Sequence, residues 1–369
     1  MVYRAIGLMS GSSLDGLDIA FAEFHENAGK WAYEIKAAGC YPYSEKWKED
    51  LKNAINLSAL DYQLLHTAYG HYIGEQVNKF IEANQLYYQV QLIASHGHTT
   101  FHLPQQQMTG QIGDGAAIAA ETGINVVSDL RAMDVALGGQ GAPIVPIGEK
   151  LLLGDYTFFL NLGGIANISM NASGYIAYDV CAANRVMNML TLELGKEYDD
   201  GGMIAAGGVV DEDLLFKLNS LEYYQQPYPK SLANDFGTDI VYPVIKDSGI
   251  NTQDGLRTYV EHICEQIQLA IGNWQLTNNS GQRSTVNDQL LVTGGGALNT
   301  FLIQRLTETL KEINVEVIVP DEKLINYKEA LIMALMGLLR WREENNVMAS
   351  VTGALRDSIN GAVWIGQDA

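Results

Sequence analysis

The chain has 369 residues, of which 47% are hydrophobic and 18% are charged, a balance typical of a well-packed globular protein and not of a disordered one. With 23 basic and 43 acidic residues its formal net charge is −20, which argues against binding to nucleic acid or an anionic membrane through a basic surface. The length suffices for two domains, and any bound nucleotide would need Mg²⁺ to neutralise much of its phosphate charge.

The first predicted feature is a pair of strands, residues 5–9 and 17–21, joined by a turn rich in glycine and serine. Glycines permit close approach of a ligand, and the N–H groups of such a turn form a concavity that suits phosphate oxygens. For one isolated turn of this kind, an ordinary hairpin is the better interpretation. Two similar turns later in the chain favour phosphate binding, and Asp15 or Asp18 could then face a metal ion.

Residues 31–41 are predicted to add a third strand, followed by helices at 45–56 and 61–84. A short strand at 90–94 is predicted to end in a polar loop with Ser95, His96 and His98. Strands that end in polar loops are where α/β folds place their chemistry. Two histidines at this spacing, with no third ligand, are a weak metal site, so hydrogen bonding to a polar substrate or simple loop structure is favoured.

A helix at 113–122, with Asp114 as its candidate cap, and a strand at 125–128 precede a long irregular stretch at 129–146. Loops of this length inside a compact domain are usually functional. Arg131 in this loop could bind a carboxylate through two parallel hydrogen bonds, although a surface ion pair with a neighbouring aspartate is the usual fate of such a residue.

The second strand–turn–strand unit consists of strands at 157–162 and 165–170 around Gly163 and Gly164. A further strand at 175–178 is predicted to end just before Asp179, ahead of a helix at 183–194. A carboxylate in that position could act as a general base, and a helix N-cap is the competing interpretation. Cys181 has no clear activating neighbour and is predicted to pack in the interior.

The next segments are predicted to be a glycine-rich stretch at 199–208, an irregular stretch at 226–239 and a long helix at 252–276. A strand at 290–293 then leads into the third glycine turn. Gly294, Gly295 and Gly296 would let a nucleobase or ribose lie against bare backbone, and a plain strand-to-helix turn explains them equally well. The chain has neither a Rossmann nor a Walker A motif. A strand is predicted at 316–319, and Glu329 is predicted to open an apolar helix at 327–342. The Glu329 carboxylate is either partly buried or exposed at the helix N-terminus, where the helix dipole favours a negative charge.

The three cysteines are widely spaced and odd in number, which indicates neither a disulfide framework nor a zinc site. The N-terminus lacks the pattern of a secretory signal, and no apolar run approaches the length of a membrane span. We therefore expect a soluble cytoplasmic protein.

The strand–turn–strand pattern near residue 11 recurs near residue 163, which predicts two similar α/β halves that bind a nucleotide in the cleft between them. We place an N-terminal domain at 1–128 and a C-terminal domain at 129–349, and we expect residues 350–369 to pack back on the first domain.

Taken in order, these segments resemble the anhydro-N-acetylmuramic acid kinases over essentially the whole chain. The most specific stretches are the first turn, G-G-Q-G-A-P at 138–143 and N-L-G-G-I-A-N at 161–167. Further matches are S-H-G at 95–97, Q-I-G-D at 111–114, the triple glycine with Asn299, Glu329 with Ala330, and V-T-G-A at 351–354.

The resemblance implies a two-domain α/β fold of the actin/hexokinase/Hsp70 type, a homodimer, and the use of ATP with Mg²⁺. It also implies a role in recycling bacterial peptidoglycan. In the family's reaction, water opens the 1,6-anhydro bridge of anhydro-N-acetylmuramic acid while the freed O6 takes the γ-phosphoryl group, giving N-acetylmuramic acid 6-phosphate and ADP.

The resemblance also implies roles for particular residues. Asp179 matches the family's base. The positions expected to bind nucleotide are Gly11, Ser12, Ser13, Leu14, Asp15, Gly16, Leu17, Asp18, Gly163, Gly164, Asn167, Gly294, Gly295 and Gly296. Those expected to bind or support the sugar are His96, Arg131, Asn184 and Glu329. The metal ligands stay open between Asp15 and Asp18.

Two departures from the family's pattern lie beside the expected sugar site. Where the family commonly reads D-T-G-P-G-N, this chain has D-V-C-A-A-N at 179–184, and His98 stands where glutamine is usual. They favour, as an alternative, a kinase of the same fold that acts on another amino sugar. A slow ATPase that acts as a binding module is a further alternative, and a glycosidase without ATP would leave the three glycine turns unexplained.

Overall fold

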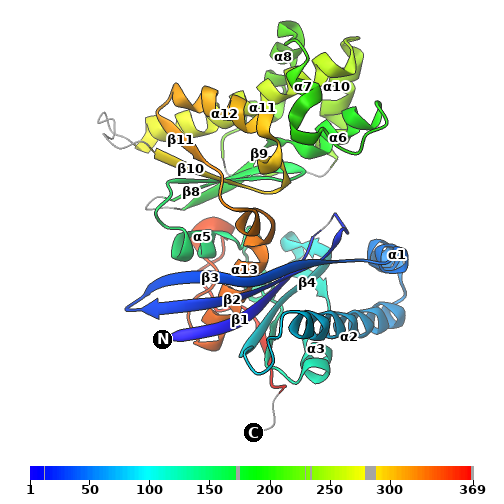
Figure 1. The fold of residues 1–369 in the computed structure, drawn as a ribbon, viewed down its shortest axis with the longest axis vertical. Coiled ribbons are helices and arrows are strands. Elements are labelled where there is room, and N and C mark those ends of the chain that lie inside the picture. Colours follow the sequence, from blue (N-terminus) through cyan, green and yellow to red (C-terminus); the bar gives the residue numbers. More distant parts are fainter. Residues whose placement is uncertain (12, 172–174, 229, 233–234, 279–287, 367–369) are drawn as a thin grey trace. The chain divides into compact units, whose positions relative to one another are not determined.

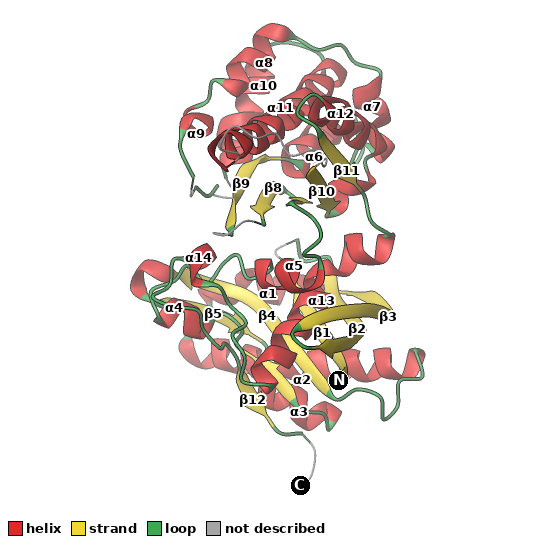
Figure 2. Cartoon of the chain, turned by 90° about the vertical axis from the view of Figure 1, so that its left-hand side faces the viewer, coloured by secondary structure: helices red, strands yellow, loops and turns green. Residues whose placement is uncertain are grey.

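The computed structural model describes residues 1–11, 13–171, 175–228, 230–232, 235–278 and 288–366. The chain forms two compact units: unit 1 contains residues 1–154 and 327–369, and unit 2 contains residues 155–326. Each unit has a mixed β-sheet with helices packed against it, as Figures 1 and 2 show. Within the described ranges, no helix is both long and apolar enough to span a membrane.

Unit 1 begins with a meander of three antiparallel strands and continues with alternating helices and strands. Its elements are β1 (Val2–Ser10), β2 (Gly16–Asn27), β3 (Lys30–Pro42), α1 (Glu45–Asn53), η1 (Ala54–Asn56), α2 (Ala59–Ala83), β4 (Leu92–Leu103), η2 (Pro104–Gln106), β5 (Met108–Ile112), α3 (Gly115–Thr122), β6 (Val126–Ser128), α4 (Ala132–Ala136), α5 (Pro146–Leu152), most of α13 (Glu322–Trp341), α14 (Ala349–Thr352) and β12 (Ala362–Trp364). The strand order is β12-β6-β4-β1-β2-β3, with β5 paired to β4.

Unit 2 repeats this plan with a smaller sheet. Its elements are β7 (Phe158–Leu162), β8 (Ile165–Met170), β9 (Ile176–Ala182), α6 (Asn184–Leu192), η3 (Asp200–Gly202), α7 (Met203–Ala206), α8 (Glu212–Asn219), α9 (Glu222–Gln225), η4 (Phe236–Val241), α10 (Tyr242–Asp247), α11 (Thr252–Asn278), β10 (Asp288–Thr293), η5 (Gly295–Leu298), α12 (Thr300–Lys311) and β11 (Val315–Ile318). The strand order is β11-β10-β7-β8-β9.

The two sheets share one topology. In unit 1, β1 pairs antiparallel with β2 and parallel with β4, and β4 pairs parallel with β6. In unit 2, β7 pairs antiparallel with β8 and parallel with β10, and β10 pairs parallel with β11. The predicted fold class, an α/β actin-like ATPase fold with two similar halves, is therefore confirmed.

Helices cover both faces of the sheet in unit 1. Ile6 and Leu8 of β1 share a buried apolar cluster with Ile73 and Val77 of α2. Gly7 lies between them in sequence and thus points to the opposite face, where the backbone of α13 contacts it. A glycine is needed there because any side chain would overlap that helix.

The core of unit 2 is built around the long helix α11. Its buried residues Tyr259, Ile263 and Ile267 belong to the same apolar cluster as Leu160 of β7 and Val292 of β10. Helix α12 adds Leu302, Leu306 and Leu310 to this cluster at helical spacing. Figure 2 shows these helices against the sheet of the same unit.

The division between the units differs from the boundary at 128/129 that we expected from the sequence. Residues 129–154 and 327–349, which we placed in the C-terminal domain, belong to unit 1, and the loop and α5 bond and pack within it. Gln140 N–H donates to the carbonyl of Thr352 at 2.8 Å, and Gly148 of α5 lies against Ile332 of α13. The C-terminal segment also joins unit 1, where β12 pairs antiparallel with β6.

One expected element boundary is wrong in a way that affects the site. The strand predicted at 90–94 continues as β4 to Leu103, because the polar residues after Ala94 pair with β1 and β5. The helix predicted at 327–342 is the part of α13 that follows a kink at Tyr327, which has φ −122° and ψ 15°, and a further helical segment from Glu322 precedes that kink. Glu329 therefore lies in the first turn after the kink.

Candidate functional site

Three of the residues expected to bind or support the sugar line one cavity of about 330 Å³ in unit 1. They are His96, Arg131 and Glu329, which are far apart in the sequence. The other residues that line the cavity are Met9, Ser10, Gly11, His98, Thr99, Ala142, Pro143, Ile144, Val145 and Met333. The cavity thus adjoins the start of the first glycine turn.

His96 and His98 lie in β4, not in a loop, at an irregularity in its pairing with β1 where Gly97 has φ +72°, and both line the cavity. The Nδ1 of His96 lies 2.9 Å from the carbonyl oxygen of Gly97, so Nδ1 carries the proton of the neutral ring. Burial, reinforced by Arg131, lowers the pKa of His96 to about 4. His96 therefore contributes a neutral imidazole whose Nε2 is an acceptor.

His98 is held by a chain of hydrogen bonds that begins at the end of β1. Its Nδ1 lies 3.0 Å from Ser10 Oγ, which also accepts a hydrogen bond from the Tyr43 hydroxyl at 2.8 Å. The Tyr43 hydroxyl lies 2.5 Å from that of Tyr69. Burial lowers the pKa of His98. Among the described residues, no group of three His, Cys, Asp or Glu side chains could hold a metal ion.

Arg131 donates hydrogen bonds from two of its three guanidinium nitrogens. Its Nε donates to the carbonyl of Gly141 at 2.6 Å and its Nη1 to Thr99 Oγ1 at 3.2 Å, and within the described ranges no carboxylate forms an ion pair with it. The alternative of a surface ion pair is therefore wrong. Burial lowers its pKa, and Asp134 opposes that shift.

Asp134 instead organises the loop that Arg131 contacts. One carboxylate oxygen accepts from the N–H of Gly141 at 2.7 Å and the other from the Thr352 hydroxyl at 2.7 Å. Its own N–H donates to Asn360 Oδ1 at 2.9 Å. The buried aspartate thus ties the 138–141 loop to the C-terminal segment.

Glu329 shares its helix with a buried ion pair. The preceding residue, Lys328, donates to Glu149 Oε1 of α5 at 3.0 Å, with side chains only 5% and 3% exposed. Burial raises the pKa of Glu329; Lys328 lowers it, while Asp18 and Glu149 add to the rise. Glu329 is thus a carboxyl group whose ionised form is disfavoured by its surroundings.

The first glycine turn presents backbone N–H groups and two aspartate side chains. Ser13 and Asp15 are exposed, Leu14 has φ +59°, and the predicted Ser12 lies outside the described residues. Gly16 has no room for a side chain, since a Cβ would lie 2.6 Å from the carbonyl oxygen of Tyr41. The two aspartates differ in environment, because Asp18 is partly buried beside Cys40.

Asp18 lies opposite Cys40 in the β2–β3 ladder. Burial raises the pKa of Asp18, and a hydrogen bond with the Cys40 thiol opposes that rise. One or two carboxylates beside phosphate oxygens fit Mg²⁺, which usually keeps several waters and takes few protein ligands. The geometry leaves the choice between Asp15 and Asp18 open.

Asp179 belongs to unit 2 and lies within β9, which runs to Ala182. The N-cap residue of α6 is Ala183, so the alternative of Asp179 as a helix cap is wrong. Asp179 Oδ1 accepts from the amide Nδ2 of Asn167, and Oδ2 accepts from Leu232 N–H at 2.8 Å and from Ser231 Oγ at 3.1 Å. The carboxylate is half-buried and held on both oxygens.

The two glycine turns of unit 2 pack against each other. A Cβ on Gly294, which has φ +82°, would lie 2.4 Å from Asn161 Oδ1, and a Cβ on Gly296 would lie 2.6 Å from that of Leu162. Asn184, expected at the sugar, donates to the carbonyl of Leu162 at 2.9 Å. Its place is therefore between these two turns. The carbonyls of Gly163 and Gly164 accept from the first N–H groups of α6.

Several residues of these sites were not found from the sequence. Tyr43 and Tyr69 support Ser10, and Ser231 and Leu232 contact Asp179. The only available signal was the irregular segment at 226–239, which has no periodicity that would identify individual contacts.

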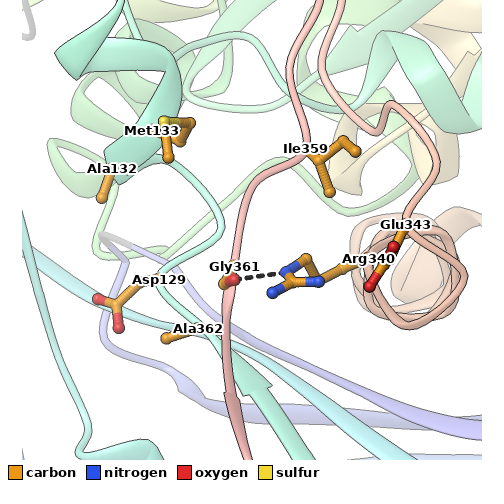
Figure 3. Close-up of a pocket in the computed structure, with 8 residues that line it drawn as sticks. All are labelled: Asp129, Ala132, Met133, Arg340, Glu343, Ile359, Gly361 and Ala362. Carbon is orange, nitrogen blue, oxygen red and sulfur yellow. Dashed lines mark hydrogen bonds between the residues drawn. The ribbon is translucent and has the colours of Figure 1, made fainter.

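A second hollow in unit 1, of about 480 Å³, contains none of the predicted site residues. Figure 3 shows Arg340 between Glu343 and the segment that leads into β12, with Asp129 nearby. The Nε of Arg340 donates to the carbonyl of Gly361 at 2.7 Å. This hydrogen bond links the C-terminal segment to the end of α13.

Comparisons with known proteins agree over almost the whole chain. A family model described as "Anhydro-N-acetylmuramic acid kinase" matches residues 3–366. Curated proteins with that name include one from Sulfurimonas denitrificans, 32% identical over 97% of this chain and 98% of that protein. Another, from Vibrio parahaemolyticus, is 33% identical over 97% of each chain.

Among solved structures, the activator of the 2-hydroxyisocaproyl-CoA dehydratase from Clostridium difficile with bound ADPNP matches with a TM-score of 0.46 and 13% identity. The match covers 92% of this chain and 96% of that one. A similarity at this level supports no conclusion about activity.

Proposed function

The chain belongs to the anhydro-N-acetylmuramic acid kinase family, and we propose that it opens the 1,6-anhydro ring of 1,6-anhydro-N-acetylmuramic acid and phosphorylates O6. Water and ATP are consumed, and N-acetylmuramic acid 6-phosphate and ADP are formed, in the recycling of peptidoglycan. The oxygen of water bonds to C1, the C1–O6 bond breaks, and O6 bonds to the γ-phosphorus as the bond to ADP breaks.

Asp179 acts in this proposal as the general base that takes a proton from the attacking water. The observation that carries the assignment is the fixed carboxylate: donors hold both oxygens, so the orientation of the carboxylate is set. A carboxylate that activates water at an anomeric carbon is the arrangement of an inverting glycosidase.

The cavity of unit 1 supplies groups that suit an acidic amino sugar. Arg131 carries a guanidinium with no carboxylate partner among the described residues, and it can bind the substrate's carboxylate. Neutral His96 offers an acceptor for a sugar hydroxyl. Glu329 offers a carboxyl group on the same wall, so the three side chains can discriminate a sugar that carries both hydroxyls and an acid.

Nucleotide binding is assigned to the glycine turns. In unit 1 the assigned residues are Gly11, Ser12, Ser13, Leu14, Asp15, Gly16, Leu17 and Asp18; in unit 2 they are Gly163, Gly164, Gly294, Gly295 and Gly296. Mg²⁺, held by Asp15 or Asp18 together with phosphate oxygens, would neutralise phosphate charge. We further propose a homodimer in the cytoplasm, on the family resemblance alone.

The test is ADP release from Mg-ATP with and without 1,6-anhydro-N-acetylmuramic acid, for the wild type and Asp179→Asn. We expect the sugar to stimulate ADP release and the substitution to remove nearly all of that stimulation while nucleotide still binds. If another amino sugar stimulates ADP release by the wild type and this sugar does not, the other sugar is the substrate. Equal ADP release without any sugar would indicate an ATPase instead.

A further inference from the structure

Asn167 and Asp179 face each other across the β8–β9 ladder, next to an irregularity in the register between Ala166 and Asn167. A bulge at a sheet rim re-aims the neighbouring side chain. Here the amide Nδ2 of Asn167 donates to Asp179 Oδ1. The amide of Asn167, which we expected from the sequence to contact nucleotide, thus contacts the carboxylate of Asp179.

The other oxygen of Asp179 is held from a distant part of the chain. Leu232 N–H donates to Oδ2 at 2.8 Å and Ser231 Oγ at 3.1 Å. A carboxylate has about four lone-pair sites, of which these three donors occupy three. Among the described residues no donor occupies the fourth site, and the carboxylate cannot rotate without breaking a hydrogen bond.

The backbone around Ser231 is itself fixed to β9. Asp179 N–H donates to the carbonyl of Lys230 at 3.3 Å, and the Tyr223 hydroxyl donates to the carbonyl of Asp179 at 2.5 Å. The Lys230 ammonium donates to the carbonyl of Tyr223 at 3.1 Å and lies over the Tyr223 ring. Both the backbone and the carboxylate of residue 179 thus depend on the segment from Tyr223 to Leu232.

We infer that Asn167 and Ser231, together with the N–H of Leu232, are positioning groups that fix the orientation of the Asp179 carboxylate for proton transfer from the attacking water. This inference rests on the proposed function, because it assigns supports to the base named there. Asn167 is a positioning residue of the ring-opening step and not a ligand of ATP.

The experiment measures kcat and the sugar KM of sugar-dependent turnover at one fixed pH for the wild type and three variants, with ATP affinity measured separately by equilibrium binding. In Asn167→Leu and Ser231→Ala one donor to the carboxylate is lost, so kcat should fall by about tenfold while the sugar KM changes less than about twofold. In Asn167→Asp a second carboxylate lies beside the first, so kcat should fall further. ATP affinity should change less than about twofold in all three.

Ser231 is exposed, so Ser231→Ala tests the inference even if an Asn167 variant does not fold. Ser220→Ala is the matched control, because the Ser220 hydroxyl donates only to the Phe216 carbonyl and is exposed. The kcat and the sugar KM of Ser220→Ala should match those of the wild type.

An unchanged kcat with a large loss of ATP affinity in the Asn167 variants would overturn the inference and make Asn167 a nucleotide ligand. A loss of kcat accompanied by equally weakened binding of sugar and of ATP would also overturn it, since a purely structural role predicts that result. A wild type without sugar-dependent turnover would instead end the proposed function itself, and the inference with it.

Discussion

Gly7 of β1 and Ala330 of α13 lie so close that a Cβ on Gly7 would be 1.8 Å from the carbonyl oxygen of Ala330. The clash would be with helix backbone, which cannot rotate away as a side chain can. A second contact of the same kind, Gly337 against Ala94 of β4, repeats this approach two turns later. These contacts bring α13 onto the sheet and thereby place Glu329 beside Ser10 and His96 in one cavity.

Gly7→Ala should therefore destabilise the protein by about 3 kcal/mol or more, because the new methyl group forces α13 off the sheet. Urea denaturation measures the loss. Gly272→Ala is the matched control: Gly272 lies inside α11 with nothing near its Cβ position, so alanine should stabilise the helix by up to about 1 kcal/mol. Equal stability of Gly7→Ala and the wild type would contradict the close approach of β1 and α13.

Glu329→Gln should make the protein more stable at neutral pH while lowering sugar-dependent turnover. Burial raises the pKa of Glu329 above its ordinary 4.5, so the folded state holds the proton more tightly than the unfolded state. The contribution of this group to stability is therefore fully present below pH 4.5 and is lost as pH rises through the raised pKa. Glutamine does not ionise, so the variant does not lose this stability at neutral pH.

Thermal unfolding at pH 7 and at pH 4 checks the direction of this effect. The difference in melting temperature between Glu329→Gln and the wild type should be smaller at the lower pH. Glu343→Gln changes an exposed glutamate and should leave the melting temperature unchanged at both values. A less stable Glu329→Gln at pH 7 would mean that the carboxylate is favoured by its surroundings, contrary to the pKa direction.

His262 of α11 predicts an acid-sensitive stability for unit 2. Its Nδ1 lies 2.7 Å from Asn219 Oδ1, its Nε2 lies 3.0 Å from the Tyr224 hydroxyl, and burial lowers its pKa to about 3. The unfolded chain takes up the proton first, so stability is lost as pH falls from about 6.5 towards 3. The slope from this one group is at most about 1.4 kcal/mol per pH unit.

The free energy of unfolding against pH, compared between the wild type and His262→Gln, isolates this contribution from that of the carboxylates. The slope between pH 6 and pH 4 should be shallower in the variant by about the amount given for one group. A variant slope equal to that of the wild type would show that His262 does not titrate in this range.

Much of the fold was predictable because it depends on local patterns. The two strand–turn–strand units near residues 11 and 163 are repeated apolar runs around glycines, and they became the first two strands of two sheets with one topology. Asp114 caps α3 as predicted, since its side chain accepts from the N–H of Ala116 at 2.9 Å. Helix caps and alternating strands follow from neighbouring residues alone.

Element boundaries near the site were less predictable for a physical reason. His96 and His98 read as a loop because polar residues follow an apolar run, yet β4 continues through them since β1 and β5 offer partners. Asp179 likewise lies in a strand because β8 pairs with it. Strand pairing depends on distant segments, which local propensity does not contain.

The sequence by itself determined the family, the two similar α/β halves and the residue types from which a kinase site can be built, because these are properties of motifs and of their order along the chain. Only the tertiary structure decided what those residues contact: Arg131 with Gly141 and Thr99, Asn167 with Asp179, and Ser231 with the same carboxylate. The reason is that a hydrogen bond joins atoms that are close in space. The loops and ladders that bring residues 99, 131, 167, 179 and 231 to their partners form only when the whole of each unit packs.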